Sequence, residues 1–408
     1  MAVVMAWFVP YRVPLFRELA LMDGVDLTVI FCSAVEEGRD WTVPQDLPFN
    51  AVFLRPGPGV RYRYRHLFGE SNSIRYPAGL LRALREIDPD VLVGYEFRPE
   101  CIAAAVYALV HRKAYIVWSD ITGLLDARLG VLRRWVRRAI LSKSKAVIGS
   151  SSDTLDHFGE TFGYPRERMV LSILSAHLDD FAAIPTVALS WEGSPDGAVR
   201  FVFSGRLVSL KGLDSLIRAF VDVKKHLAGA VLTILGDGPE RSRLEDLAAQ
   251  SGLRESIFFK GALPHARMAE ELLRHDVFVF PTRLDVFGLS VAEAVACGLP
   301  VICSKNAGAA RDLVRQNGVT FNPDRLDELT VAMVRLGRDP DLRRSMAEAS
   351  KAVAAGHGLA NAVAGFREAL ALACPNLSPM PRQQVGTGVE GPEIAQTELT
   401  WGEKRVHS

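Results

Sequence analysis

The sequence predicts an α/β protein made of two Rossmann-like domains, whose parallel sheets face each other across a cleft. Short apolar runs alternate with longer amphipathic runs over most of the chain, which is the pattern of a parallel sheet covered by helices. A segment rich in Pro, Gly and small polar residues interrupts the alternation at 186–198 and indicates a linker between two such series. The length of 408 residues also favours more than one domain.

The first series, residues 1–185, is expected to form the N-terminal domain. Its strands are predicted at Val3–Phe8, Asp26–Phe31, Val91–Gly94, Ala114–Trp118 and Ala146–Gly149. Its helices are predicted at Pro14–Leu21, Pro77–Ile87, Glu100–His111 and Thr154–Phe162. Pro14 and Pro77 suit the first turn of a helix, where a missing N–H costs nothing.

The second series, residues 199–357, is expected to form the C-terminal domain. Its strands are predicted at Arg200–Ser204, Ala230–Leu235, Ile257–Lys260, Val277–Phe280 and Pro300–Cys303, with helices at Leu213–Leu227 and Glu240–Ser251. A terminal helix at Ala362–Leu372, within 358–375, is expected to pack back on the N-terminal domain. Residues 376–408 are rich in Pro, Gly, Gln and Thr without periodicity, so disorder is expected there.

The composition argues against several classes of function. A formal net charge of +1 gives no overall electrostatic reason to bind nucleic acid. The five cysteines lack metal-ligand or disulfide spacing and fit a reducing compartment. No apolar run is long enough to cross a bilayer, and the first residues lack the charged region of a signal peptide. We therefore expect a cytoplasmic protein whose only membrane contact would be peripheral, on the inner face.

The first candidate binding element contains Gly205, Arg206 and Lys211. Gly205 follows an apolar strand, where a glycine permits a tight turn and lets the backbone approach a ligand. The helix that begins after Lys211 offers free N–H groups at its N-terminus. Two cations at that place would meet an anion such as a phosphate, although an ordinary turn with two solvated cations has the same pattern.

The second element, Gly236-Asp237-Gly238-Pro239, follows the next predicted strand. Arg241 stands where a dinucleotide-binding fingerprint would have its third glycine, so the segment is not such a fingerprint. By itself this pattern is more typical of a strand-to-helix turn than of a binding site.

The third element, Pro281–Pro300, is the most informative. Asp285 lies in the loop after a strand, Gly288 opens a helix, and Glu293 lies one turn inside that helix. The N–H groups of Gly288–Ser290 make a helix start that can receive an anion. A carboxylate inside such a helix can accept hydrogen bonds from hydroxyls, for example those of a ribose. The spacing alone is equally compatible with a solvated Asp and an ordinary Glu on a helix face.

Together the three elements resemble the retaining GT-B glycosyltransferases of family 4, the set described as glycosyl transferases group 1. The matching segments, in family order across about Val199 to Arg335, are Gly205-Arg206, Lys211-Gly212, Gly236-Asp237-Gly238-Pro239, Phe287-Gly288-Leu289, Glu293-Ala294 and Gly298-Leu299-Pro300-Val301-Ile302. The resemblance implies a GT-B architecture and a UDP- or GDP-sugar donor as substrate, with no cofactor. It also implies a saccharide or lipid-linked acceptor.

The resemblance assigns roles to individual residues of the second domain. Arg206 and Lys211 would hold the donor diphosphate and assist its departure. Glu293 would bind the ribose hydroxyls, and the amides of Gly288, Leu289 and Ser290 would face the phosphate. Gly205, Gly236 and Gly238 belong to the same donor-binding loops. Asp285 stands where the family usually has a Glu placed against the donor sugar, so this sequence has D-x7-E in place of E-x7-E.

The N-terminal half departs further from the family pattern. Members often carry a His just after the strand that corresponds to Ala114–Trp118, and here Ser119 stands at that position, followed by Asp120. The glycine-rich first loop of the family is replaced by a segment that contains Tyr11 and Arg12. These four residues are the acceptor-side candidates, and we expect Tyr11 and Arg12 to face the cleft.

A metal is not expected at this site. The nine histidines show no paired ligand spacing. Asp88-Pro89-Asp90 matches the DxD pattern of metal-dependent glycosyltransferases, but it precedes a predicted strand and therefore lies at the wrong end of the sheet. Arg206, Lys211 and helix amides would then meet the charge of the leaving group.

Two basic segments have no role in the family pattern. Residues 128–145 combine seven cations with apolar residues at helical spacing, which is typical of a helix lying on an anionic membrane. A helix packed on the core with a basic outer face has the same pattern and is slightly favoured. The second segment, Arg61–His66, is expected in a loop, where it could bind an acidic or pyrophosphate-bearing acceptor or remain solvated.

The leading hypothesis is a retaining glycosyltransferase of surface polysaccharide or glycolipid synthesis. A nucleotide-sugar epimerase of the same architecture would act on the donor alone. A non-catalytic nucleotide-sugar-binding protein remains open because of Asp285 and the absent acceptor-side His.

Overall fold

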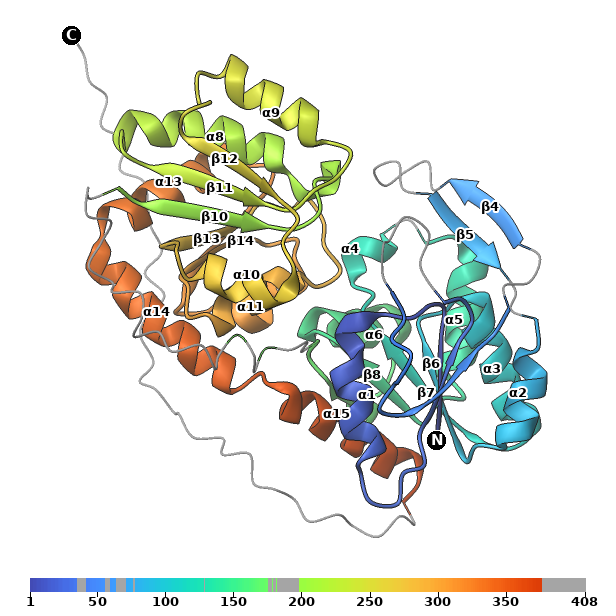
Figure 1. The fold of residues 1–408 in the computed structure, drawn as a ribbon. Coiled ribbons are helices and arrows are strands. Elements are labelled where there is room, and N and C mark those ends of the chain that lie inside the picture. The colour runs from blue at the N-terminus through green and yellow to red at the C-terminus, as the bar shows by residue number, and fades with distance from the viewer. Residues whose placement is uncertain are drawn as a thin grey trace.

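A computed structural model describes residues 1–34, 42–55, 59–63, 71–75, 78–127, 129–174, 178, 181 and 198–375. Within them, two parallel sheets, each covered by helices, form two domains, and a long helical segment near the C-terminus connects them (Figure 1). The fold is therefore α/β with two Rossmann-like domains, as predicted. The segments expected to form the linker, at 186–197, and the disordered tail, at 376–408, lie outside the described residues.

The N-terminal sheet has seven parallel strands in the order β3-β2-β1-β6-β7-β8-β9. The strands are β1 (Ala2–Met5), β2 (Thr28–Phe31), β3 (Asn50–Phe53), β6 (Val91–Tyr95), β7 (Ala114–Ser119), β8 (Ala146–Gly149) and β9 (Met169–Leu171). The strand order reverses between β1 and β6, which is the point where open α/β sheets bind ligands. Helices η1 (Pro10–Arg12), α1 (Val13–Ala20), α2 (Leu80–Ile87), α3 (Pro99–Val110), α4 (Gly123–Asp126), α5 (Val131–Leu141), α6 (Ser152–Phe162) and η2 (Arg166–Arg168) connect these strands.

The C-terminal sheet has six parallel strands in the order β12-β11-β10-β13-β14-β15. The strands are β10 (Arg200–Ser204), β11 (Val231–Leu235), β12 (Ile257–Gly261), β13 (Val277–Phe280), β14 (Val301–Ser304) and β15 (Gly318–Phe321). Its order reverses between β10 and β13. The helices are η4 (Ser209–Lys211), α8 (Leu213–His226), α9 (Arg241–Gln250), α10 (His265–Leu272), α11 (Leu289–Ala296), α12 (Ala310–Leu313), α13 (Leu326–Arg338) and α14 (Pro340–Ala355).

The apolar pattern of each element explains its place in these layers. All four residues of β13 are buried, as expected of a parallel strand covered by helices on both faces. Helix α8 buries Leu213, Leu216, Ile217, Phe220 and Val223, a stripe at helical spacing that packs on the sheet.

The last helix, α15 (Leu359–Ala373), follows α14 but packs on the N-terminal sheet (Figure 1). Phe366 is fully buried and meets the Trp118 ring edge-on at a centroid distance of 4.8 Å. A Cβ added to Gly365 would lie 2.5 Å from the Leu171 carbonyl oxygen, so only glycine permits this approach of helix and strand. The C-terminal end of the chain thus completes the core of the N-terminal domain.

The two domains also touch directly through α6 and α12. The backbone N–H of Ser152 donates to Asp312 Oδ2 at 2.8 Å, and the Ser152 hydroxyl donates to Asp312 Oδ1 at 2.5 Å. Arg311 forms an ion pair with Asp156 beside them. These contacts join the N-terminal and C-terminal domains directly.

Some predicted elements differ from the structure. The strand expected at Val3–Phe8 ends at Met5, because Phe8 and Val9 are buried by packing without pairing in the sheet. Helix α2 begins at Leu80, after Gly79, and Pro77, which was expected in its first turn, lies outside the described residues.

The segment expected to be a loop at Arg61–His66 was also wrongly assigned. Residues 61–63 belong to β4 (Gly59–Arg63), which pairs in antiparallel fashion with β5 (Ser71–Arg75); residues 64–66 lie outside the described ones. The strands β3, β9 and β15 and helix α4 were not predicted, since three or four residues give little periodicity. None of the helices in the described part of the chain is long and apolar enough to span a membrane.

Candidate functional site

The predicted residues of the second domain gather at the carboxyl ends of β10 and β13, where the order of the C-terminal sheet reverses. Arg206 and Lys211 follow β10, while Asp285 and Gly288 follow β13. Lys211 Nζ forms an ion pair with Asp285 and lies 5.1 Å from the centre of the Phe280 ring. Their side chains are 20% and 13% exposed, so the pair is reachable from the cleft but largely shielded from water.

Backbone geometry accounts for the glycines of this cluster. Gly212 has φ of +66°, and a Cβ there would lie 2.1 Å from the carbonyl oxygen of Pro281. Gly236 has φ of +127°, and its Cβ would lie 2.0 Å from the carbonyl oxygen of Gly205. The loops after β10, β11 and β13 therefore pack backbone against backbone, which keeps Lys211 beside Asp285. Gly238 likewise approaches Leu207 O, so Gly236 and Gly238 have a packing role in the described structure.

Helix α11 begins at Leu289 with Gly288 as its N-cap in the left-handed region, at φ of +99°. No side chain caps this helix start, so the first N–H groups, including that of Ser290, remain available to a ligand. A Cβ on Gly288 would lie 3.0 Å from the Phe280 ring. The helix therefore starts directly over the ring that also lies below Lys211.

Glu293 lies one turn inside α11, and its side chain is partly exposed. Burial raises the pKa of its carboxyl group to about 7. Among the described residues, no side chain or backbone group donates a hydrogen bond to this carboxylate. The carboxylate still reaches solvent, so it is open to hydrogen bonds from a ligand that supplies hydroxyl groups.

The acceptor-side candidates form a buried network at the reversal point of the N-terminal sheet. Arg12 is only 1% exposed and donates to Asp120 Oδ2 at 2.8 Å, while its guanidinium stacks on Trp118 at 4.0 Å. The Tyr95 hydroxyl donates to the same carboxylate oxygen at 2.5 Å. The expectation that Arg12 faces the cleft was wrong, because its charge is paired inside the domain. Tyr11 is half-buried and packs against the apolar cores of both domains.

Glu96 joins this network and was missed in the sequence. It follows β6 with φ of +67°, a conformation that is rare for residues other than glycine. Its carboxylate accepts from the Ser119 hydroxyl at 3.1 Å and from the Asp120 N–H at 2.7 Å. Burial and the nearby charge of Asp120 raise the pKa of Glu96 to about 8. A charged residue directly after an apolar strand was the available signal.

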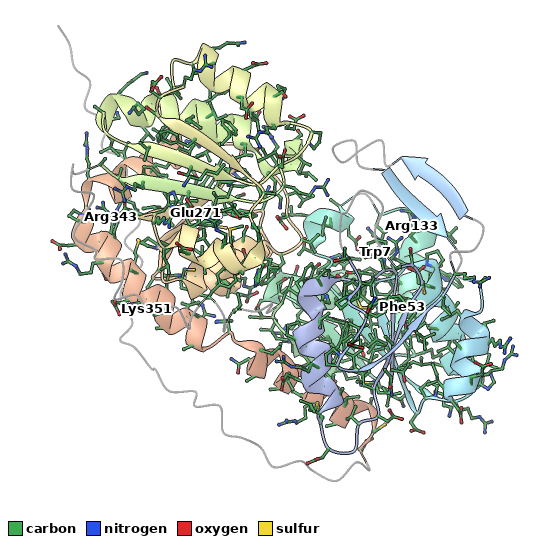
Figure 2. All side chains as sticks on the ribbon, viewed as in Figure 1. Trp7, Phe53, Arg133, Glu271, Arg343 and Lys351 are labelled. Carbon is green, nitrogen blue, oxygen red and sulfur yellow. The ribbon has the colours of Figure 1, made fainter. Side chains whose placement is uncertain are left out.

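A cavity of about 530 Å³ opens beside Glu96. Its lining is mostly apolar and combines the loops after β1 and β6 with α4 and α5; it includes Trp7, Phe97, Ile102, Leu125, Leu132 and Val136. Trp7 and Arg133, both lining residues, lie on the side of the N-terminal domain turned toward the other domain (Figure 2). Val286 of the C-terminal domain completes the wall, and it is the residue next to Asp285. The cavity and the Lys211–Asp285 pair therefore share a border.

The Asp88-Pro89-Asp90 segment lies away from this site. Asp88 ends α2 and pairs with Lys113 at 2.8 Å, before β6 begins. The segment is thus at the amino end of the sheet, opposite the cavity, as predicted. No cluster of three potential metal ligands occurs among the described residues.

Family models match both halves of the chain. The model described as glycosyl transferases group 1 matches residues 191–353, and the one described as glycosyl transferase 4-like domain matches residues 10–172.

Several curated relatives are named as GDP-mannose-dependent mannosyltransferases. A GDP-mannose-dependent alpha-(1-6)-phosphatidylinositol monomannoside mannosyltransferase of Mycolicibacterium smegmatis is 34% identical over 36% of this chain and 40% of its own length. The matched segment is thus less than half of that relative. A protein of the same name from Mycobacterium tuberculosis is 29% identical over 74% of this chain and 76% of its own length.

Solved structures share the fold at low identity. The Anabaena protein HepE, in complex with UDP, has a TM-score of 0.70 at 15% identity, covering 91% of this chain and 100% of its own. Sucrose-phosphate synthase of Thermosynechococcus elongatus has a TM-score of 0.65 at 17% identity, covering 90% and 98%.

Proposed function

We propose that this protein, which belongs to the GT-B glycosyltransferases of family 4, moves a sugar from a nucleotide-diphosphate sugar to a hydroxyl acceptor with retention at the anomeric carbon. The observation that carries the proposal is the shared border between the Lys211–Asp285 pair and the cavity of the other domain, which Val286 forms. A donor held at the pair and an acceptor held in the cavity would meet there.

Lys211 and Arg206 would bind the diphosphate of the donor. In the absence of a ligand, Lys211 is paired with Asp285, which balances its charge. A diphosphate brings at least two negative charges, and together with the free N–H groups at the start of α11 it would compete for this ammonium group. Asp285 would then be released toward the sugar, where its carboxylate can accept a hydrogen bond from a hydroxyl.

Glu293 would accept hydrogen bonds from the two ribose hydroxyls. Its carboxylate is partly exposed and has no donor among the described residues, so it is open to the ribose hydroxyls.

During transfer, the bond between the anomeric carbon and the diphosphate oxygen breaks, and a bond to the acceptor oxygen forms on the same face. The diphosphate leaves with the bonding electron pair, and its departing oxygen takes up the proton that the acceptor hydroxyl loses. Lys211 and Arg206 would stabilise the charge that develops on the leaving oxygen.

The acceptor would enter through the cavity beside Glu96. The carboxylate of Glu96 can orient a hydroxyl, while the apolar walls favour an acceptor with an apolar part. A glycolipid or lipid-linked saccharide fits this combination. The names of the mannosyltransferase relatives, which specify phosphatidylinositol monomannoside, support the same class.

The proposal is tested by incubating the purified protein with GDP-mannose or UDP-glucose and either phosphatidylinositol or n-octyl α-D-mannoside as probe acceptor. We expect a glycosylated product whose anomeric configuration, read by NMR, equals that of the donor. Lys211→Ala should lower kcat by about 10²–10³-fold, while Lys351→Ala, at an exposed position on α14, should not. An inverted product, or full activity of Lys211→Ala, would contradict the assignment.

A further inference from the structure

Exposed apolar side chains are concentrated on α3, α4 and α5 of the N-terminal domain. These side chains, here called the α3–α5 face, are Val106, Leu109, Val110, Leu124, Val131, Leu132 and Trp135. They make up half of the large apolar side chains that are exposed in the described part of the chain. An apolar cluster of this kind on a water-facing surface indicates a partner.

Helix α5 presents its apolar residues outward. The sequence slightly favoured a helix packed on the core with a basic outer face, and this expectation was wrong. Only Arg137 and Leu141 of α5 are buried, whereas Val131, Leu132 and Trp135 are 87%, 74% and 67% exposed. Arg137 points inward and pairs with the buried Asp126. Leu141 and Ile140, at the end of α5, pack on the core, whereas Val131, Leu132 and Trp135 remain outside it.

Cations surround this apolar surface. The segment from 131 to 145 contains no acidic residue, and Arg134, Arg138, Lys143 and Lys145 are all exposed. Arg112, at the end of α3, is exposed at the same edge. Lys113, next to Arg112, forms an ion pair with Asp88, with 2.8 Å between Nζ and Oδ1. Since the whole chain has a net charge of only +1, this concentration of positive charge is local.

A cavity of about 420 Å³ lies between α3 and α5, within this face. Apolar side chains, among them Val106, Leu109, Trp135 and Ile140, line its walls, and Lys143 and Lys145 lie at its border. An apolar slot bordered by ammonium groups matches the chemistry of an acyl chain attached to an anionic headgroup.

We propose that the α3–α5 face docks the protein on an anionic phospholipid bilayer. Val131 and Trp135 enter the interface between headgroups and acyl chains, and the surrounding cations contact lipid phosphates. Val136 and Ile102 line both the cavity between α3 and α5 and the cavity beside Glu96. A docked bilayer therefore lies next to that cavity. The docking itself requires no sugar transfer, so it can be tested separately from the proposed function.

The test is co-sedimentation of the purified full chain with two kinds of vesicle, without donor or acceptor. One kind is phosphatidylcholine alone, and in the other about a third of the lipid is phosphatidylglycerol. We expect binding to the anionic vesicles that weakens at high salt, and little binding to phosphatidylcholine.

Two variants separate the apolar and ionic contributions. Val131→Gln/Trp135→Gln and Arg134→Glu/Lys143→Glu should each weaken binding to the anionic vesicles by about tenfold or more. The matched control, Val331→Gln/Arg218→Glu, changes an exposed apolar residue and an exposed cation of the C-terminal domain and should bind like the wild type. Thermal unfolding at wild-type temperature would show that each variant is folded.

The proposal is overturned if the wild type binds neither vesicle, or binds both equally. It is also overturned if the α3–α5 variants bind like the control. A third outcome is that the wild type stays unbound to vesicles and self-associates, while Val131→Gln/Trp135→Gln does not self-associate. That outcome would overturn membrane docking and assign the face to a second copy of the chain.

Discussion

At the scale of single residues, the raised pKa of Glu293 predicts how stability depends on pH. Burial raises the pKa of its carboxyl group from 4.5 to about 7. Between these two values the folded protein binds more protons than the unfolded chain, so the free energy of unfolding falls as the pH rises through this window. Above about pH 7 the folded state carries a partly desolvated charge that no described residue pairs.

Glu293→Gln removes that charge, and we expect it to be more stable than the wild type at pH 8 by about 1–3 kcal/mol. At pH 4.5, where both forms are neutral in the fold, the difference should largely disappear. Urea unfolding at the two pH values measures this. An advantage of equal size at both values would show that the charge of Glu293 is not its origin.

The same residue predicts how donor affinity depends on pH. In the proposed complex two ribose hydroxyls donate to an ionised carboxylate, so binding would favour deprotonation of Glu293. We expect the affinity for the nucleotide to increase by about tenfold between pH 6 and pH 8, measured by calorimetry in buffers of different ionisation enthalpy. Proton release on binding near pH 6.5, absent in Glu293→Gln, would support the assignment, and a flat pH profile would oppose it.

The residues of the site differ in how far they could be predicted. Lys211 and Asp285 are 74 residues apart, and the structure pairs them because each follows a strand at the reversal point of one sheet. Strand order can be inferred from a βα pattern, so this proximity was accessible. The inward orientation of Arg12 was not, because it depends on Asp120, Tyr95 and Trp118, which come from other strands.

At the scale of elements, the loops of the second domain depend on glycines that meet backbone atoms. Gly212 and Gly163 offer a matched comparison, because both have φ of +66°. A Cβ at Gly163 meets nothing within 4 Å, whereas one at Gly212 meets the Pro281 carbonyl oxygen at 2.1 Å. The two positions therefore separate backbone strain from steric contact.

We expect Gly163→Ala to cost about 1 kcal/mol, the usual penalty of a left-handed alanine. Gly212→Ala should cost at least ~3 kcal/mol, since the loop after β13 must move. It should also weaken nucleotide binding, because Lys211 is the neighbouring residue. Denaturant unfolding of both variants measures the difference. Equal losses of unfolding free energy in the two variants would mean that the loop at Pro281 moves aside without a significant energetic penalty.

Element prediction succeeded where apolar periodicity was long and failed where it was short. The strands β10 and β13 and the helix α8 were found within a residue or so of their observed ends. Helix α5 was also found, but its orientation was misassigned. An amphipathic pattern defines two faces without saying which one meets the core, and here α5 buries Arg137.

At the scale of the whole molecule, α15 makes the N-terminal domain depend on the end of the chain. Phe366 is fully buried against Trp118 in the core of the N-terminal sheet. Phe366→Ala should lower the free energy of unfolding by about 3–5 kcal/mol. Hydrogen exchange should locate the loss of protection in β7 and β8 of the N-terminal domain. Loss confined to α13 and α14 would contradict this packing.

The central claim is that the cluster around Lys211, Asp285 and Glu293 binds a nucleoside diphosphate, and calorimetric titration with UDP and GDP tests it most directly. We predict binding of at least one of the two by the wild type, weakened by about tenfold or more in Arg206→Ala and Lys211→Ala. Arg218→Ala, a surface change on α8, should bind like the wild type. No binding of either nucleotide by the folded wild type, or equal binding by all three variants, would contradict the account.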